Sequence, residues 1–406
     1  MRHEPLGQFE VPRGTSAASS VDVTIVMPCL NETQCLPHCI ANAQQALERI
    51  ADQYGLTGEI LIADNGSTDG SQELAVHLGA RVVNVPERGY GAALIGGSKA
   101  AYGKYIMMGD ADGSYDFTDG VAMIGELERG AGLCMGNRFA GGIVPGAMPP
   151  LHRYLGNPVL SAIARWLHGS PVRDFHCGLR AYTREAFERI GARSPGMEFA
   201  SEMVINASRA GLAVREVPIT LHRDLRERAP HLRSFRDGWR HLRHIIAHAP
   251  DTMYLLPGLT LLATGILGLA ILAEGPVRIA GQYFGIHFVA LSSMATLIGL
   301  AAILLGSMAK VAIAIYQPTY RGRIVSWLKR GRPLEWLVGS GGILATFGLA
   351  ADLLLAFKWI FVGGAMELSI HLSFAITTAV VAGVMMVLSG FVLKLLLDTL
   401  DHYPAR

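Results

Sequence analysis

The sequence predicts a chain of two parts: an α/β domain with a mostly parallel sheet, followed by an all-α transmembrane domain of about four helices. Of the 406 residues, 50% are hydrophobic and the mean hydropathy is +0.32, which is too apolar for an ordinary soluble protein of this length. Nearly every long apolar run lies beyond residue 252, whereas residues 21–250 mix apolar and polar stretches. The two parts therefore face different solvents.

The first part alternates strand patterns with helical patterns. The β-branched run 21–27 precedes apolar positions at helical spacing, namely Leu36, Ile40, Ala43, Leu47 and Ile50. Three further strands are expected at 59–63, 81–85 and 105–108, with helices at 70–78, 92–101 and 118–127. Later strands are expected at 132–136, 178–182 and 213–220. This alternation predicts a mostly parallel sheet whose ligand site lies beyond the carboxyl ends of its strands.

Four apolar stretches are long enough to cross a bilayer core of about 30 Å. They are 253–273, 286–315, 334–356 and 370–397. The connector 317–333 carries five cationic residues, Arg321, Arg323, Lys329, Arg330 and Arg332, whereas the other two connectors carry one each. The positive-inside rule then places this connector and both termini in the cytoplasm. Because residues 1–20 contain no apolar signal-peptide core, we expect the α/β domain to stay in the cytosol at the inner membrane.

The domain limits follow from these patterns. We expect a flexible tail at 1–20, the α/β domain at 21–225, a juxtamembrane helix at 226–252, the transmembrane domain at 253–400 and a short tail at 401–406. The juxtamembrane helix has one apolar face, made of Leu232, Phe235, Trp239, Leu242 and Ile246. Its arginines occupy another face, so this helix is expected to lie on a membrane. Three histidines at helical spacing, His241, His244 and His248, are expected on a hydrated face.

Charge and cysteine content exclude some classes of protein. The net charge of +2 is too small to indicate a nucleic-acid partner, and the basic residues cluster where the two parts join. All five cysteines precede residue 178 and include no CxxC pair, which is typical of reduced thiols. Cys35, His38 and Cys39 lie one helical turn apart, but packed thiols are favoured over metal ligation because a fourth ligand is not obvious.

The fourth predicted strand is followed by Asp110-Ala111-Asp112, a D-x-D pair. Extended geometry aims both carboxylates the same way, and two convergent carboxylates require a cation between or in front of them. Mg²⁺ or Mn²⁺, held by carboxylate and diphosphate oxygens, is the natural occupant. A capped turn would explain the pair equally well if it stood alone.

Polar residues also follow the other predicted strands. The first strand ends in 28–32 (PCLNE), the second in 64–70 (DNGSTDG), and the third leads into 88–91 (RGYG). An acidic group such as Asp64 can accept a hydrogen bond from a nucleobase, and Arg88 can pair with phosphate. An ordinary turn would explain any one of these polar segments alone. It does not explain three of them in succession followed by the D-x-D pair after the fourth strand. An NAD-binding domain is disfavoured because 89–94 lacks the third glycine and follows the third strand.

Eight segments together resemble the family 2 glycosyltransferases with a GT-A fold, particularly the dolichyl- or polyprenyl-phosphate sugar synthases. They are PCLNE, DNGSTDGS, ERGYGAA, GDADGSYDF, GNRF, DFHCGLRAY, SEMVINASRAGLAVREVPI and HLRSFRDGWRHLR, within about residues 21–250. At position 65 the family frequently has a second Asp, whereas this chain has Asn65. This departure leaves open which nucleobase the donor carries. The number of membrane spans also differs among relatives.

The resemblance implies a role for each matching residue. Nucleotide-sugar binding is implied for Pro28, Leu30, Asn31, Glu32, Asp64, Arg88, Gly91 and Asp110. Metal binding is implied for Asp110 and Asp112, and catalytic roles for Asp112, Arg138, Asp174 and Arg180. Lipid-phosphate binding is implied for Arg223, Arg226 and Arg228.

The implied activity is transfer of a hexose, with inversion, from UDP-glucose or GDP-mannose to a polyprenyl phosphate at the membrane. A phosphate monoester, with a second pKa near 6, is already anionic at neutral pH, so arginines need only position it. A glycosyltransferase that uses a hydroxyl acceptor, with Glu202 as base, remains open, as does a lipid transporter or scaffold with a degenerate sugar-binding domain. A processive polysaccharide synthase is disfavoured because the sequence lacks a Q-x-x-R-W segment. A homo-oligomer is possible.

Overall fold

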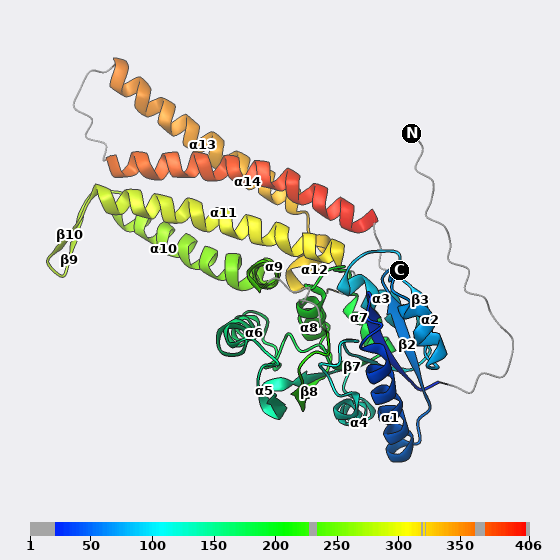
Figure 1. Cartoon of the computed structure of the whole chain (residues 1–406). Coiled ribbons are helices and arrows are strands. Elements are labelled where there is room, and N and C mark those ends of the chain that lie inside the picture. Colours follow the sequence, from blue (N-terminus) through cyan, green and yellow to red (C-terminus); the bar gives the residue numbers. More distant parts are fainter. Residues whose placement is uncertain (1–20, 227–233, 318–319, 321, 362–369, 403–406) are drawn as a thin grey trace. The chain divides into compact units, whose positions relative to one another are not determined.

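The computed structural model describes residues 21–226, 234–317, 320, 322–361 and 370–402 (Figure 1). The chain divides into two compact units. The first takes in residues up to Ala147 together with Gly178–Arg184 and Glu216–Glu227, and the second takes in Met148–Cys177, Glu185–Arg215 and the residues from Arg228 onward. The first unit thus carries most of the sheet, and the second carries the membrane helices.

An eight-stranded mixed sheet with the order β3-β2-β1-β4-β7-β5-β8-β6 organises the α/β part. Its strands are β1 (Val23–Cys29), β2 (Gly58–Asp64), β3 (Arg81–Asn84), β4 (Tyr105–Met108), β5 (Leu133–Asn137), β6 (Gly142–Ile143), β7 (Arg180–Thr183) and β8 (Val214–Leu221). β1 pairs in parallel with both β2 and β4, and β2 pairs in parallel with β3. β7 runs antiparallel between β4 and β5. The predicted mostly parallel sheet is confirmed.

Helices follow the parallel strands, as the alternation predicts. In the first unit they are α1 (Leu36–Tyr54), α2 (Ser71–His77), α3 (Tyr90–Ala100), η1 (Phe117–Gly120), α4 (Val121–Glu128) and α5 (Arg138–Gly141). α1 buries one stripe that includes Leu36, Ile40 and Ile50, and Gly55 ends it with φ +68°. β1 is buried along nearly its whole length because it is a central parallel strand.

In the second unit, helices α6 (Asn157–His168) and α8 (Phe199–Arg209) pack against α9 (Ser234–Ala247). The Nε2 atom of His168 lies 2.9 Å from the carbonyl oxygen of Ile245, and Ser201 Oγ lies 2.9 Å from Nδ1 of His241. Burial lowers the pKa of His244 to about 3. The expectation of a hydrated histidine face is therefore wrong: α6 and α8 cover this side of α9. The second unit also contains η2 (His152–Gly156) and most of α7 (Arg184–Ile190).

The last residue of α8, Arg209, joins three elements of the second unit. It donates a hydrogen bond to the carbonyl oxygen of His248, the residue after α9. It donates another, at 3.1 Å, to Oε1 of Gln317, the residue after α11. Its guanidinium carbon lies 5.5 Å from the ring centroid of Tyr320. This arginine thus connects α8 with the residues that follow α9 and α11, all within the second unit.

Four helices are long and apolar enough to cross a membrane, as predicted. They are Asp251–Leu272, formed by η3 (Asp251–Leu255) and α10 (Leu256–Leu272), and α11 (Ile286–Tyr316), α13 (Pro333–Phe361) and α14 (Ile370–His402). α10 packs on α11, α11 on α14 and α13 on α14 (Figure 1). At 31 residues, α11 is about 46 Å long and exceeds the thickness of a bilayer core.

Glycines allow the paired membrane helices to approach closely. A Cβ atom added to Gly299 of α11 would lie 2.3 Å from the backbone nitrogen of Leu262 on α10. A Cβ atom added to Gly341 of α13 would lie 2.7 Å from the carbonyl oxygen of Gly383 on α14. Small residues at such positions are the usual basis of helix association in membranes.

Two elements of the membrane part are not predicted from the sequence. The hairpin of β9 (Val277–Ile279) and β10 (Gln282–Phe284) turns at Ala280 and Gly281, both with positive φ (49° and 82°). The short helix α12 (Arg323–Arg330) buries Val325 and Leu328 against α11 and α14 and leaves Trp327 exposed.

All five cysteines are free and buried, as expected for reduced thiols. Burial raises the pKa of Cys29 to about 11 and the pKa values of Cys39 and Cys134 to about 12.

Since only the thiolate is nucleophilic, we predict that iodoacetamide at pH 8 leaves Cys29, Cys39 and Cys134 of the folded protein unmodified. Mass spectrometry of the labelled protein, with a urea-unfolded sample as control, checks this. Rapid labelling of Cys29 before unfolding would contradict the prediction.

Candidate active site

The loops that follow β1 and β2 are hydrogen-bonded to each other. The backbone N–H of Asn31, a residue with φ +59°, donates to Ser67 Oγ at 2.9 Å, and Thr68 N–H donates to Asn31 Oδ1 at 2.8 Å. The carboxylate of Asp64, which is 1% exposed, accepts from Gly66 N–H at 2.9 Å and from Gln72 Nε2 at 2.7 Å. Asp64 is thus held rigidly at the carboxyl edge of the sheet.

Asn65 organises the next loop along the same edge. Its Nδ2 donates to the carbonyl oxygens of Val85 and Glu87, at 3.1 and 2.7 Å, and its Oδ1 accepts from Gly89 N–H at 2.8 Å. Two of these partners need an amide donor, which an aspartate could not supply. The departure from the family pattern therefore has a structural reason. Arg88 donates to the carbonyl oxygen of Asn65 and covers Gly66.

The D-x-D pair follows β4, next to the loop after β1. Asp112 Oδ1 accepts from the backbone N–H and the hydroxyl of Ser114, at 3.0 and 2.6 Å. Burial, followed by repulsion from Asp112, raises the pKa of Asp110, although a hydrogen bond with Tyr90 and the charge of Arg180 oppose this shift. The two carboxylates are thus close enough to compete for ionisation, and a cation would relieve their repulsion.

Arg226 supplies a cation at this position in the structure. Its guanidinium forms two contacts with the carboxylate of Glu32, at 2.9 and 3.1 Å, and a third with Asp112 Oδ2 at 3.3 Å. The sequence resemblance assigns Arg226 to lipid-phosphate binding and does not indicate this contact with the D-x-D pair. Because Asp112 and Arg226 lie 114 positions apart in the chain, no local pattern could reveal this contact.

The remaining predicted residues are placed as follows. Pro28 lies within β1 opposite Ala63, Leu30 directly follows that strand, and Gly91 is buried in the first turn of α3. Arg180 begins β7, is fully buried, and lies opposite Met108, the last residue of β4. Arg138 is buried where β5 passes into α5.

The other basic residues and Asp174 are more dispersed. Arg223 is on the exposed side of the segment that follows β8, and its Nε donates to the carbonyl oxygen of Pro145 at 2.6 Å. Asp174 is fully buried in the second unit. Arg228, like Leu232 and Arg233 of the predicted juxtamembrane helix, lies outside the described residues. The structure therefore brings Arg226 together with Glu32 and Asp112, and it leaves Asp64 at the end of β2 on the same edge of the sheet. Arg223 instead contacts Pro145.

A divalent ion fits the acidic pair only if the substrate completes its coordination. Within the described part of the chain, no group of three or more histidine, cysteine, aspartate or glutamate side chains is arranged to hold a metal ion. Mg²⁺ is commonly bound by one or two carboxylates together with substrate phosphates and water. Asp110 and Asp112 match that arrangement.

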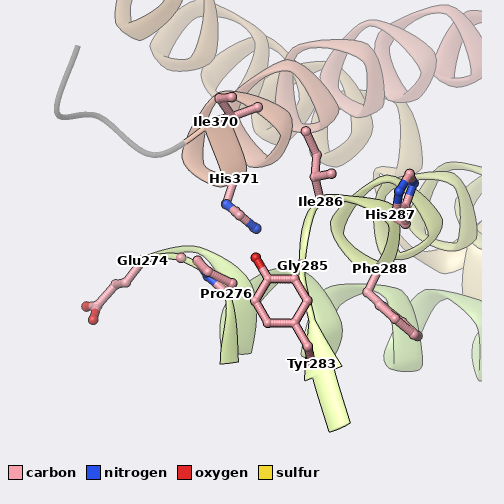
Figure 2. Close-up of a pocket in the computed structure, with 10 residues that line it drawn as sticks. Glu274, Pro276, Tyr283, Gly285, Ile286, His287, Phe288, Ile370 and His371 are labelled. Carbon is pink, nitrogen blue, oxygen red and sulfur yellow. The ribbon is translucent and has the colours of Figure 1, made fainter. Parts of the chain in front are cut away.

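A cavity of about 550 Å³ lies elsewhere, at the end of the membrane helices that adjoins the β9–β10 hairpin (Figure 2). The ring of Tyr283 and the imidazole of His371 point into the same space, between the hairpin and the first turn of α14. None of the predicted site residues that the structure describes lines this cavity.

Comparison with known proteins identifies the family. The family model described as glycosyl transferase family 2 matches residues 24–191, and the model of the family 2 C-terminal transmembrane region matches residues 307–397. The low-salt glycan biosynthesis hexosyltransferase Agl6 of Haloferax volcanii is 37% identical over 91% of this chain and 88% of its own length. The chain belongs to glycosyltransferase family 2. It is a membrane glycosyltransferase, as the resemblance of its motifs implies.

A more distant relative and a solved structure also match parts of this family 2 glycosyltransferase. A dolichyl-phosphate hexose transferase of Haloferax volcanii is 30% identical over 49% of this chain and 82% of its own length. The solved structure of glucosyl-3-phosphoglycerate synthase from Mycobacterium tuberculosis with Mn²⁺, UDP and phosphoglyceric acid has a TM-score of 0.41 and 24% identity. The match covers 56% of this chain and 76% of the chain in that structure. A likeness this weak carries no argument about activity.

Proposed function

We propose that this glycosyltransferase moves a hexose, with inversion at the anomeric carbon, from a nucleotide sugar to a polyprenyl phosphate. The observation that carries the proposal is the acidic set Glu32, Asp64, Asp110 and Asp112, which follows neighbouring parallel strands of a chain with four membrane-spanning helices. The dolichyl-phosphate hexose transferase among the relatives supports the same acceptor class. UDP-glucose and GDP-mannose are both compatible donors.

The donor would bind along the carboxyl edge of the sheet. Asp64, whose carboxylate is held by the backbone amides of Gly66 and Ser67, would accept a hydrogen bond from an N–H group of the nucleobase. Asp110 and Asp112 would hold Mg²⁺ or Mn²⁺. When bound there, the ion supplies positive charge that stabilises the departing nucleoside diphosphate.

The acceptor would need positioning more than activation. A lipid phosphate is anionic at neutral pH, so the chain need not remove a proton from it. Arg223 and Arg228 are our candidates for pairing with this phosphate, and Arg138, Asp174 and Arg180 are candidates for orienting the donor sugar. We further propose that the α/β part and both termini face the cytoplasm, on the basis of the five cationic residues in 317–333.

A hydroxyl acceptor would require a general base, for which Glu202 is the candidate from the sequence. The Glu202 carboxylate, which is 5% exposed, accepts hydrogen bonds from the backbone N–H groups of Arg193, at 3.1 Å, and Ser194, at 2.8 Å. A general base has to be able to accept a proton from the acceptor hydroxyl. The Glu202 carboxylate instead accepts hydrogen bonds from the backbone of the loop at residues 193–194. The lipid-phosphate acceptor is therefore the better proposal.

One assay tests the acceptor and the donor together. Membranes containing the protein are incubated with a single labelled nucleotide sugar, Mg²⁺ or Mn²⁺, and either a polyprenyl phosphate or the matching free polyprenol. We expect label to enter the organic phase only with the phosphate, because the free alcohol is not ionised at neutral pH. Equal labelling of the free polyprenol, or no labelling with any UDP- or GDP-hexose, would overturn the proposal.

A further inference from the structure

The contacts of Arg226 divide the Asp112 carboxylate between two kinds of partner. One oxygen, Oδ1, accepts from Ser114, whereas the other, Oδ2, faces the guanidinium of Arg226 at 3.3 Å. The same guanidinium is paired more closely with Glu32, which is 4% exposed. Asp112 Oδ2 is therefore the oxygen available to a second cation, and Arg226 is next to it.

The backbone around Arg226 is fixed onto the D-x-D turn. His222 N–H donates to the carbonyl oxygen of Ser114 at 2.9 Å, and Leu225 N–H donates to the carbonyl oxygen of Asp112 at 2.8 Å. The side chain of Leu225 lies against Gly113 so closely that a Cβ atom there would be 2.6 Å from it. The segment 222–226 thus holds the guanidinium beside the carboxylates, while the long arginine side chain retains rotatable bonds.

Charge balance explains why an arginine is held there. Glu32, Asp110 and Asp112 bring three carboxyl groups to a small and largely buried volume, and buried carboxylates require paired positive charge. A divalent ion would satisfy this requirement, and so does Arg226. A divalent ion and the Arg226 guanidinium would compete for Asp112 Oδ2, and two cations that close together repel each other.

We propose that Arg226 is an internal counter-cation of the donor site, which a divalent metal ion must displace from Asp112 in order to bind. The inference rests on the proposed function, in which Asp112 is a metal ligand. It assigns Arg226 to the control of metal binding, a role distinct from the lipid-phosphate binding implied by the resemblance. Metal loading then moves a guanidinium away from Asp112 at the edge of the donor site.

The test measures Mn²⁺ affinity in the full-length protein with UDP or GDP present, whose phosphates complete the coordination, and without sugar or lipid. Free Mn²⁺ is followed by electron paramagnetic resonance during titration of wild type, Arg226→Gln and Arg226→Lys. Loss of the guanidinium removes the competitor, so we expect Arg226→Gln to bind Mn²⁺ about tenfold more tightly than wild type. Arg226→Lys should be intermediate, because an ammonium keeps the charge but cannot bridge Glu32 and Asp112 with parallel N–H donors.

The matched control is Arg223→Gln, which removes a guanidinium from the same segment, where its Nε donates to the carbonyl oxygen of Pro145. Its Mn²⁺ affinity should equal that of wild type. Unchanged or weaker Mn²⁺ binding by both Arg226 variants would overturn the inference. A different result, no Mn²⁺ binding by wild type even with UDP or GDP present, would instead contradict the proposed donor site.

Discussion

The substitution Asp112→Asn is expected to reduce hexose transfer on the order of 1,000-fold, because it removes the negative charge that would hold a divalent ion against the donor diphosphate. The amide oxygen of asparagine can still accept from the backbone N–H and hydroxyl of Ser114. The turn after β4 should therefore persist. Transfer of labelled hexose to lipid, measured at saturating Mg²⁺ or Mn²⁺, checks the loss, and thermal unfolding checks that the protein is still folded.

The control for this variant is Asp116→Asn, a substitution of the same kind four residues further on. Asp116 caps η1 by accepting from Thr118 N–H at 2.8 Å, and asparagine caps helices nearly as well as aspartate. Transfer by the Asp116→Asn protein should match that of wild type. If Asp112→Asn also turned over at the wild-type rate, the assignment of Asp112 to the donor site would be wrong.

The second large effect is expected in the membrane part, from Gly341→Val. A Cβ atom at this position would lie 2.7 Å from the carbonyl oxygen of Gly383 and 2.8 Å from Cβ of Met386, so α13 and α14 would have to separate. Overpacking of this kind costs about 1–3 kcal/mol, and more where backbone is the obstacle. The midpoint of thermal unfolding in detergent should fall clearly below that of wild type.

The neighbouring glycine provides the control. A Cβ atom at Gly342 would meet nothing within 4 Å, so Gly342→Val adds the same side chain to the same helix without a clash. We expect its unfolding midpoint to stay close to that of wild type. Equal destabilisation by both variants would mean that helix propensity, and not contact between α13 and α14, sets the result.

The long elements of this fold could be predicted because each is encoded by a local pattern. The four membrane helices follow from length and apolarity alone, and β1 to β4 follow from apolar runs that precede helical spacing. The hairpin β9–β10 and the helix α12 were missed because each is short. Ala280, which adopts a positive φ in the turn, is not a usual turn residue, and only Val325 and Leu328 of α12 are buried.

The site was partly predictable for a related reason. Asp64, Asp110 and Asp112 directly follow strands, so the topology of a parallel sheet places them at one edge. The position of Arg226 depends on how the segment after β8 returns to the D-x-D turn, which is a tertiary contact. Likewise, the pattern of α9 indicates two faces but not that α6 and α8 would cover the histidines.

The contacts of Arg209 bear on how this enzyme can be handled in the laboratory. A soluble fragment ended before Asp251 would keep α8 but would lose Gln317 and Tyr320, both of which contact this guanidinium. The guanidinium would keep its hydrogen bond to His248 but lose its other two contacts, and removing partners from a buried charged group costs stability. Purification in detergent or nanodiscs, with every helix retained, is the appropriate route to the active protein.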